Sequence, residues 1–162
     1  MMIRNTLRKF RNKFLCYKYP FLEIPNCSPR YLVTWLDFLS KGWKKAFGKK
    51  LCKDLRKLLK KQRLLKEVVI TNIKEKRGLL IISTNIFNDD IENLLLYYEY
   101  LSACYCSCCG KPVRYVAEDF KQYICENCAK ESRSCRRLTR DDIPKLSPEI
   151  NWVKKWGLKN EK

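Results

Sequence analysis

The cysteines of this chain, together with its lack of histidine, limit what it can fold into more than any other feature. The 162 residues include ten cysteines and no histidine. Four cysteines form two C-x-x-C pairs, Cys106 with Cys109 and Cys125 with Cys128, and fifteen residues separate the pairs. A C-x-x-C turn lets two thiolates converge on one ion, and two pairs at this spacing are typical of a structural Zn²⁺ site. Because the chain has no histidine, such a site takes all its ligands from cysteine.

A disulfide framework or a set of unrelated buried thiols would also use many cysteines. Disulfides belong to oxidising compartments, and the first residues carry charges instead of the apolar stretch of an export signal. The longest uninterrupted apolar run, Leu94 to Tyr98, is far shorter than a membrane-spanning helix of about 20 residues. We therefore expect a cytoplasmic setting, no transmembrane segment, and a bound metal rather than disulfides.

The choice of ligands stays partly open, because other cysteines lie close by. Cys104 and Cys108 flank the first pair and Cys135 follows the second, so each can compete for the metal. The proposed first pair is favoured by its spacing and by the following Gly110, which suits a tight backbone turn. The remaining cysteines are distant in sequence and are expected to be buried thiols: Cys16, Cys27 and Cys52.

The segment between the two pairs, residues 112–124, is rich in β-branched and aromatic residues and predicts a short hairpin. Two cysteine pairs joined by a hairpin make a zinc-ribbon or treble-clef-like module, which we place at residues 104–135. Its apolar content is small, so zinc must supply much of its folding free energy, on the order of 10 kcal/mol.

Hydrophobic periodicity predicts an α+β fold, in which helices pack on a short antiparallel β-hairpin. The helices are expected at about 2–16, 29–39, 43–63 and 89–103, and the hairpin at about 67–84. Ser28-Pro29 is expected to open the second helix, Asp89 with Glu92 to form a capping box, and residues 74–77 to turn the hairpin. Residues 1–103 then form a basic α+β domain, and residues 136–162 a tail with a short helix at about 148–156.

Positive charge is the second constraint, and it is unevenly distributed. The formal net charge is +18. Residues 1–66 hold 19 of the 35 Lys and Arg residues but 3 of the 17 Asp and Glu residues. In the helix over 43–63 the basic side chains gather opposite the apolar face, with Asp54 as its only acid. We name these residues the basic stripe: Lys45, Lys49, Lys53, Arg56, Lys57 and Lys60.

Several partners suit a basic stripe. Nucleic acid is the most common polyanion that relieves repulsion between like charges on one helix, and phosphate contacts carry little sequence preference. The alternatives are a plain solvated face, an acidic protein, and an anionic membrane surface. The N-terminal helix is the membrane candidate, because it is basic and has Phe10 and Phe14 on its apolar side. Such binding would be weak, and the two rings can instead pack on the core.

Catalysis has little support, and we expect a binding protein rather than an enzyme. Without histidine, the Ser-His, Cys-His and His-metal mechanisms are excluded within the chain. A centre with four cysteine ligands is closed, whereas catalytic zinc keeps an open position. There is no P-loop and no G-x-G-x-x-G motif. The remaining chemical alternative is thiol redox at a C-x-x-C pair, which usually needs one pair on a βαβ scaffold.

Several motifs of the chain occur in the same order in a known group of proteins. They are Lys41-Gly-Trp43, Ala46-Phe-Gly48 with Leu51-Cys52, Ile73-Lys-Glu-Lys76 with Gly78-x-Leu80, Ser102-x-x-x-Cys106-x-x-Cys109-Gly-Lys-Pro112, and Ile124-Cys-x-x-Cys128. Over about residues 40–130 the chain resembles an uncharacterised group of small bacterial and bacteriophage proteins. The resemblance implies a small zinc-bearing α+β protein of phage or prophage origin, and it transfers no functional residue. The alternative function is then an adaptor that binds a host protein through the zinc module and the Trp152/Trp156 tail.

Overall fold

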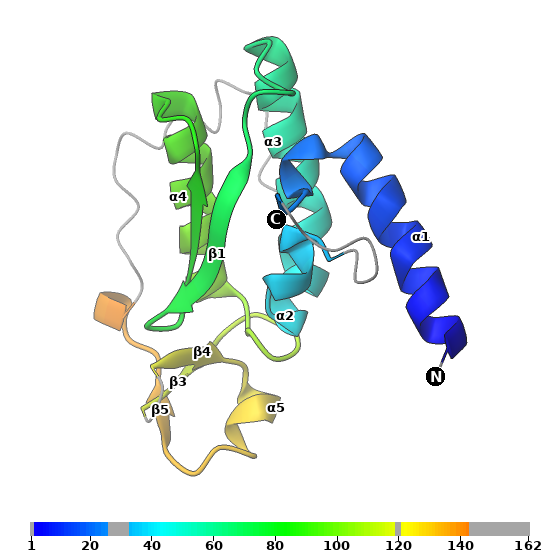
Figure 1. Ribbon diagram of the computed structural model, residues 1–162. Coiled ribbons are helices and arrows are strands. Elements are labelled where there is room, and N and C mark those ends of the chain that lie inside the picture. Colours follow the sequence, from blue (N-terminus) through cyan, green and yellow to red (C-terminus); the bar gives the residue numbers. More distant parts are fainter. Residues whose placement is uncertain (1, 26–32, 119–120, 143–162) are drawn as a thin grey trace.

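The computed structural model describes residues 2–25, 33–118 and 121–142 (Figure 1). The fold is α+β: helices pack around a two-stranded antiparallel hairpin, and a three-stranded sheet follows near the C-terminal end. The predicted fold class is therefore confirmed. In Figure 1 the small sheet lies at one end of the molecule, beside the tip of the hairpin.

The chain begins with helix α1, Met2–Lys18, which reaches two residues beyond the predicted end. A 3-10 turn, η1 at Pro20–Leu22, follows and buries Phe21 and Leu22. The helix predicted at about 29–39 is wrong over its described part. Residues 33–39 contain only a 3-10 turn, η3 at Trp35–Phe38, and Thr34 forms an isolated β-bridge with Glu23. The predicted cap Ser28-Pro29 lies outside the described residues.

Asp37 joins α1 to this 3-10 turn. Its carboxylate accepts hydrogen bonds from the Thr34 amide at 3.0 Å, from the buried Asn12 side chain at 2.8 Å, and from Arg11 at 2.9 Å. Lys44 lies 3.9 Å from the same carboxylate. Burial acts to raise the pKa of Asp37, but these hydrogen bonds and charges together hold it below its ordinary value.

The long basic helix is continuous but is built from three parts. Helix α2 covers Lys41–Trp43, a π-helical turn (η4) covers Lys44–Gly48, and α3 covers Lys49–Lys61. Its inward face supplies many of the large apolar side chains of the main core: Trp43, Phe47, Leu51, Leu55, Leu58 and Leu59. Burial of this face, rather than helix propensity, holds the lysine-rich helix in place.

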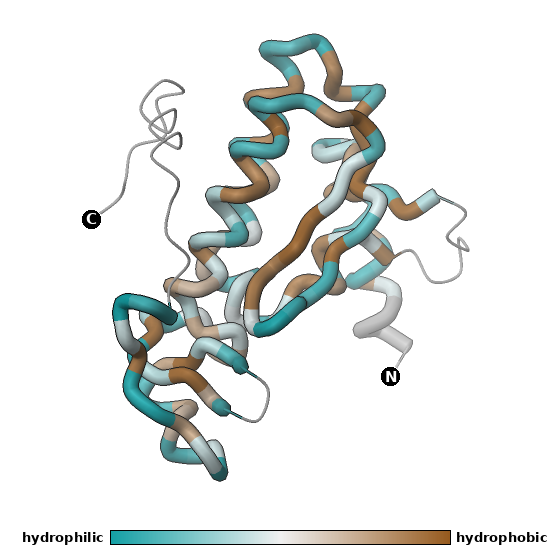
Figure 2. The backbone as a smooth tube through the Cα atoms, turned by 90° about the vertical axis from the view of Figure 1, so that its left-hand side faces the viewer, coloured by the Kyte–Doolittle hydropathy of each residue, from teal (hydrophilic) through white to brown (hydrophobic). Residues whose placement is uncertain are grey.

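The hairpin pairs β1, Ile70–Lys76, with β2, Leu79–Thr84. The turn is shorter than residues 74–77, because β1 runs to Lys76 and only Arg77 and Gly78 lie between the strands. Both have positive φ, 51° and 78°, as a tight two-residue hairpin turn requires. In Figure 2 one strand is coloured hydrophobic along most of its length, in keeping with the Leu79–Ile82 run of β2.

Helix α4, Asp89–Cys104, packs against β2 and α3 and leads into the cysteines. The predicted capping box with Asp89 as the cap is wrong by one residue. Asn88 is the N-cap, and its side chain accepts hydrogen bonds from the amides of Asp90 at 3.1 Å and Ile91 at 3.2 Å. Three acidic residues in the first turn add a favourable interaction with the helix dipole: Asp89, Asp90 and Glu92.

The C-terminal sheet has the order β4-β3-β5, with all neighbours antiparallel. Strands β3, Tyr115–Ala117, and β4, Gln122–Ile124, form the hairpin predicted between the cysteine pairs. Strand β5, Cys135–Arg137, adds a third strand that was not predicted. The short helix α5, Glu126–Ala129, connects β4 to β5. The tail helix predicted at about 148–156 lies outside the described residues.

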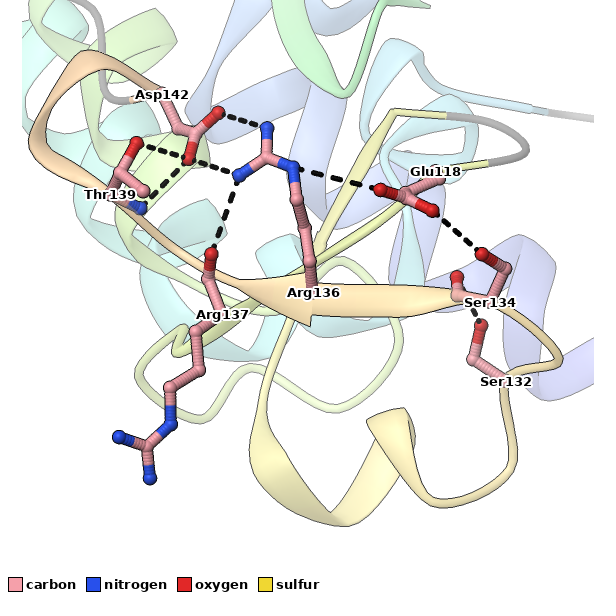
Figure 3. A network of polar contacts seen from close by, with 7 residues as sticks. All are labelled: Glu118, Ser132, Ser134, Arg136, Arg137, Thr139 and Asp142. Carbon is pink, nitrogen blue, oxygen red and sulfur yellow. Dashed lines mark hydrogen bonds and ion pairs between the residues drawn. The ribbon is translucent and has the colours of Figure 1, made fainter.

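A polar network holds β5 and the following 3-10 turn, η5 at Arg140–Asp142, on this sheet (Figure 3). Arg136 donates two hydrogen bonds to the Asp142 carboxylate, at 2.7 and 2.5 Å, and lies 3.8 Å from Glu118. Asp142 also accepts from the amide of Thr139 at 2.8 Å. The Arg136 guanidinium is therefore occupied within the fold, whereas Figure 3 shows Arg137 pointing away from the network.

Candidate metal centre and basic helix face

The first cysteine pair lies on a tight knuckle directly after α4. The Cys106 amide donates to the Lys111 carbonyl at 2.8 Å, and the Gly110 amide donates back to the Cys106 carbonyl at 2.8 Å. Gly110 has φ +79°, a left-handed conformation that a residue with a Cβ adopts only at a cost. The glycine after the pair is thus needed for the turn that aims both thiols to one side.

The second pair is positioned by β4 and α5. Cys125 follows directly after β4 and is the N-cap residue of α5, while Cys128 lies within that helix. The amide of Ala129 donates to the Cys125 carbonyl at 3.0 Å and closes the turn. Residues around both pairs form an apolar cluster that is separate from the main core: Cys106, Ala117, Ile124, Cys125 and Ala129.

The two knuckles bring their four sulfur atoms together. The Sγ atoms of Cys106, Cys109, Cys125 and Cys128 all lie within 4.8 Å of one another, and those of Cys109 and Cys125 are 3.5 Å apart. Tetrahedral zinc with Zn–S bonds of about 2.3 Å places its sulfurs about 3.8 Å apart. The observed separations are therefore those of a group that can hold one metal ion.

The pKa values of Cys109, Cys125 and Cys128 are shifted by burial, by hydrogen bonds and by the neighbouring thiols. Burial acts to raise the pKa of Cys125, but the amides of Cys128 and Asn127 and the neighbouring thiols stabilise its thiolate and lower the pKa to about 7. Burial and the other three thiols raise the pKa of Cys128. Hydrogen bonds with the Lys111 amide and the Cys128 thiol act to lower the pKa of Cys109, but burial and the thiols of Cys125 and Cys106 outweigh them and raise that pKa. A cation at the centre would favour the thiolate form of all four.

The three cysteines that the sequence offered as alternative metal ligands lie away from the four converging sulfur atoms. Cys104 is half-buried at the end of α4, where burial raises its pKa, and Cys108 is exposed. Cys135 is half-buried, and its thiol lies 3.6 Å from the Ala129 carbonyl. Within the described residues, none of these three belongs to the group of converging sulfurs. Of the three cysteines expected to be buried, Cys52 is buried, Cys16 is only half-buried, and Cys27 lies outside the described residues.

The first knuckle is joined to the start of the basic helix. The Gly42 amide donates to the Ser107 carbonyl at 2.7 Å, and a Cβ at Gly42 would collide with the carbonyls of Cys106 and Ser107. A Cβ at Gly110 would lie 2.6 Å from the Gly42 carbonyl. The indole of Trp43 donates to the carbonyls of Ser102 at 3.1 Å and Tyr105 at 2.9 Å. This contact was not predicted from the sequence, because Gly42 lies just before the helix expected at 43–63, and only the structure places it inside α2.

The basic stripe of the sequence maps onto one face of the helix with one exception. Lys45, Lys49, Lys53, Lys57 and Lys60 are all exposed. Arg56 is half-buried, and its charge lies close enough to Tyr19 to oppose the rise that burial causes in the pKa of that tyrosine. Arg56 is thus turned toward the core more than the lysines are.

The only acid of the basic helix does not neutralise the stripe. The Asp54 carboxylate accepts a hydrogen bond from the Tyr98 hydroxyl at 2.6 Å, and its side chain is 11% exposed. Lys50 lies 3.7 Å from it. Among the described residues, no carboxylate lies within 4.0 Å of Lys45, Lys49, Lys53 or Lys60. The exposed lysines therefore form a face of one charge sign.

None of the helices in residues 2–25, 33–118 and 121–142 is long and apolar enough to cross a bilayer.

No protein-family model matches the chain, and no significant match was found among curated proteins or among solved structures. The function must therefore be inferred from the chain's own residues.

Proposed function

We propose that the four converging cysteines bind one Zn²⁺ as a closed structural centre. Thiolate ligands in two C-x-x-C turns suit zinc, and four cysteines leave no position for a substrate. The separation of the sulfurs, all within 4.8 Å, supports this assignment. The ion would join α4, the small sheet and α5, and through Gly42 it would fix this module against the start of the basic helix.

We propose further that the protein binds nucleic acid through the basic stripe, with little sequence preference. The observation that carries this proposal is the single-sign face of α3, whose one acid is turned to Tyr98. Exposed lysines along one helix can contact successive phosphates and release counterions. Like charges four residues apart destabilise a helix by about 0.2–0.5 kcal/mol per pair, so a polyanion would relieve repulsion that the fold itself leaves in place.

Fluorescence anisotropy with labelled single- and double-stranded oligonucleotides tests this function. In the variant Lys49→Glu/Lys53→Glu/Lys60→Glu, affinity should fall for all sequences alike. Each lost phosphate contact should reduce the slope of log K against log salt by about 0.9 on duplex DNA. A matched control reverses three exposed charges of the C-terminal part, two in the zinc module and one at the end of β5: Lys111→Glu/Lys130→Glu/Arg137→Glu. The control has the same net charge, so it should retain most of the affinity and the slope.

Two results would oppose nucleic-acid binding at this face. One is the absence of binding at low salt. The other is an equal loss in the stripe variant and in the control, which would assign any binding to net charge alone. Recovery of a specific protein after nuclease treatment would instead favour the adaptor function.

A further inference from the structure

The inward side of helix α1 carries a buried asparagine instead of the helix's large apolar side chains. Asn12 is completely buried and bonds to Asp37, and the half-buried Leu15 packs against the main core. In contrast, four large apolar side chains of the helix are exposed: Leu7 by 65%, Phe10 by 69%, Phe14 by 61% and Tyr17 by 87%. We name these four residues the outward stripe. The sequence predicts an apolar side for this helix, but only the structure shows that it faces away from the core.

The outward stripe is continuous and points away from the body. At 100° per residue its four members fall within about 80° of one another, and Asn12 lies about 180° from their centre. Figure 1 shows α1 on the outer edge of the molecule, beside the α2–α3 helix. A flat surface can therefore meet the outward stripe without displacing α1 from the fold.

Positive charge borders the outward stripe on both sides. Lys18 lies along one edge, and Lys9 and Lys13 lie along the other. Arg11 shares the edge of Lys18, but its guanidinium donates to Asp37 at 2.9 Å and is held within the fold. The whole helix contains no acidic residue. Lys18 also places its Nζ 5.9 Å from the centre of the Phe14 ring, so charge and aromatic surface adjoin. Apolar and aromatic side chains flanked by Lys and Arg are the pattern of a helix that lies in the interface of a bilayer.

We propose that α1 binds an anionic phospholipid surface, with the outward stripe inserted among the headgroups. Phe10 and Phe14 would supply apolar burial, Tyr17 would lie at the polar boundary, and the flanking cations would meet lipid phosphates. A second copy of this helix fits less well, because its rims carry the same charge. A coiled-coil partner fits less well, since coiled coils favour aliphatic residues at the seam. Nucleic acid fits less well, because duplex DNA or RNA presents mainly sugar and phosphate and would bury little of Leu7.

Co-sedimentation of the full-length, zinc-loaded protein with vesicles tests the proposal. The vesicles contain phosphatidylcholine alone or with a quarter of phosphatidylglycerol, at about 100 mM salt, where surface charge acts over about 10 Å. We expect binding to the anionic vesicles only. The variant Phe10→Ala/Phe14→Ala should lower the partition coefficient about tenfold or more, because each ring otherwise buries apolar area. The control Phe87→Ala/Leu96→Ala removes exposed apolar groups elsewhere and should bind as the wild type does.

The altered side chains are exposed, so both variants should fold, and circular dichroism checks this. Absence of binding to anionic vesicles would overturn the proposal. Equal binding by the wild type and Phe10→Ala/Phe14→Ala would also overturn it, because charge alone would then suffice. A dimer that dissociates in this variant, or oligonucleotide binding that the variant loses without any vesicle binding, would assign the outward stripe to another partner.

Discussion

The amide of Gly42, in the first turn of the basic helix, donates a hydrogen bond to the carbonyl of Ser107 in the first cysteine knuckle, at 2.7 Å. The two residues are far apart in sequence, and the backbones approach so closely that no Cβ fits between them. The candidate metal centre and the basic helix therefore share a backbone contact. The position of the knuckle and the start of the helix are therefore fixed against each other.

Gly42→Ala is expected to destabilise the protein, because its Cβ meets backbone carbonyls that cannot move independently of the knuckle. The cost should be about 1–3 kcal/mol, as for other overpacked sites. Gly48→Ala is the matched control in the same helix, since its Cβ meets only side-chain atoms, the nearest being those of Leu36 at 3.4 Å and Leu39 at 3.5 Å. It should be neutral or stabilising by up to about 1 kcal/mol. Urea unfolding followed by tryptophan fluorescence measures both, and equal stabilities would contradict the shared contact.

Tyr98→Phe is expected to cost about 1.5–3 kcal/mol, because the Tyr98 hydroxyl is a buried donor to a carboxylate. Burial and the Asp54 carboxylate both raise the pKa of Tyr98, so the hydroxyl keeps its proton and donates. Tyr97→Phe alters the neighbouring half-buried ring and should change the free energy of unfolding by less than about 0.5 kcal/mol. Thermal or urea unfolding compares the two. Similar losses in both variants would show that Asp54 is not held by Tyr98.

Asp37→Asn is expected to destabilise the protein by about 1–3 kcal/mol at neutral pH, since the carboxylate accepts bonds from both α1 and η3. The pKa of Asp37 is lower in the folded protein than its ordinary value of 3.8. The contribution of the Asp37 carboxylate to the free energy of unfolding is therefore complete at pH values above 3.8. This contribution is lost as the pH falls through the lower pKa that Asp37 has in the folded protein. The difference in unfolding free energy between wild type and variant should shrink below about pH 4. The control Asp141→Asn, at an exposed position, should change the free energy of unfolding at neutral pH by less than about 0.5 kcal/mol.

Much of this fold could be predicted from sequence patterns, because these patterns reflect interactions between residues that are close in sequence. The C-x-x-C spacing already implies two knuckles, and the periodic leucines of α3 and the apolar runs of the hairpin imply a shared core. Where local signals are weak, the prediction is wrong. The segment around Trp35 has the apolar periodicity of a helix but forms a 3-10 turn. Asp37 in this turn accepts a hydrogen bond from Asn12 of α1, and this contact between distant segments holds the turn in place. Asn88, rather than Asp89, caps α4, because neighbouring polar residues compete for that position.

The parts that sequence could not provide are relationships between distant segments. Periodicity finds the apolar side of α1 but cannot tell whether it faces the core, and here the buried Asn12 decides the orientation. The docking of Gly42 on Ser107 could not be predicted, because Gly42 lies just before the helix expected from the sequence. Likewise, Arg56 belongs to the basic stripe by spacing, but the structure turns it toward Tyr19. Side-chain direction at such positions is set by packing and not by period.

The proposed zinc centre requires the four converging cysteines and none of their cysteine neighbours. Native mass spectrometry of the reduced, full-length protein tests it most directly, using the wild type, Cys125→Ser and the exposed control Cys108→Ser. We predict one zinc ion in the wild type and in Cys108→Ser, and its loss in Cys125→Ser, because three thiolates bind zinc less tightly than four. A metal-free wild type would contradict this assignment. So would a result in which Cys108→Ser loses the zinc ion and Cys125→Ser retains it.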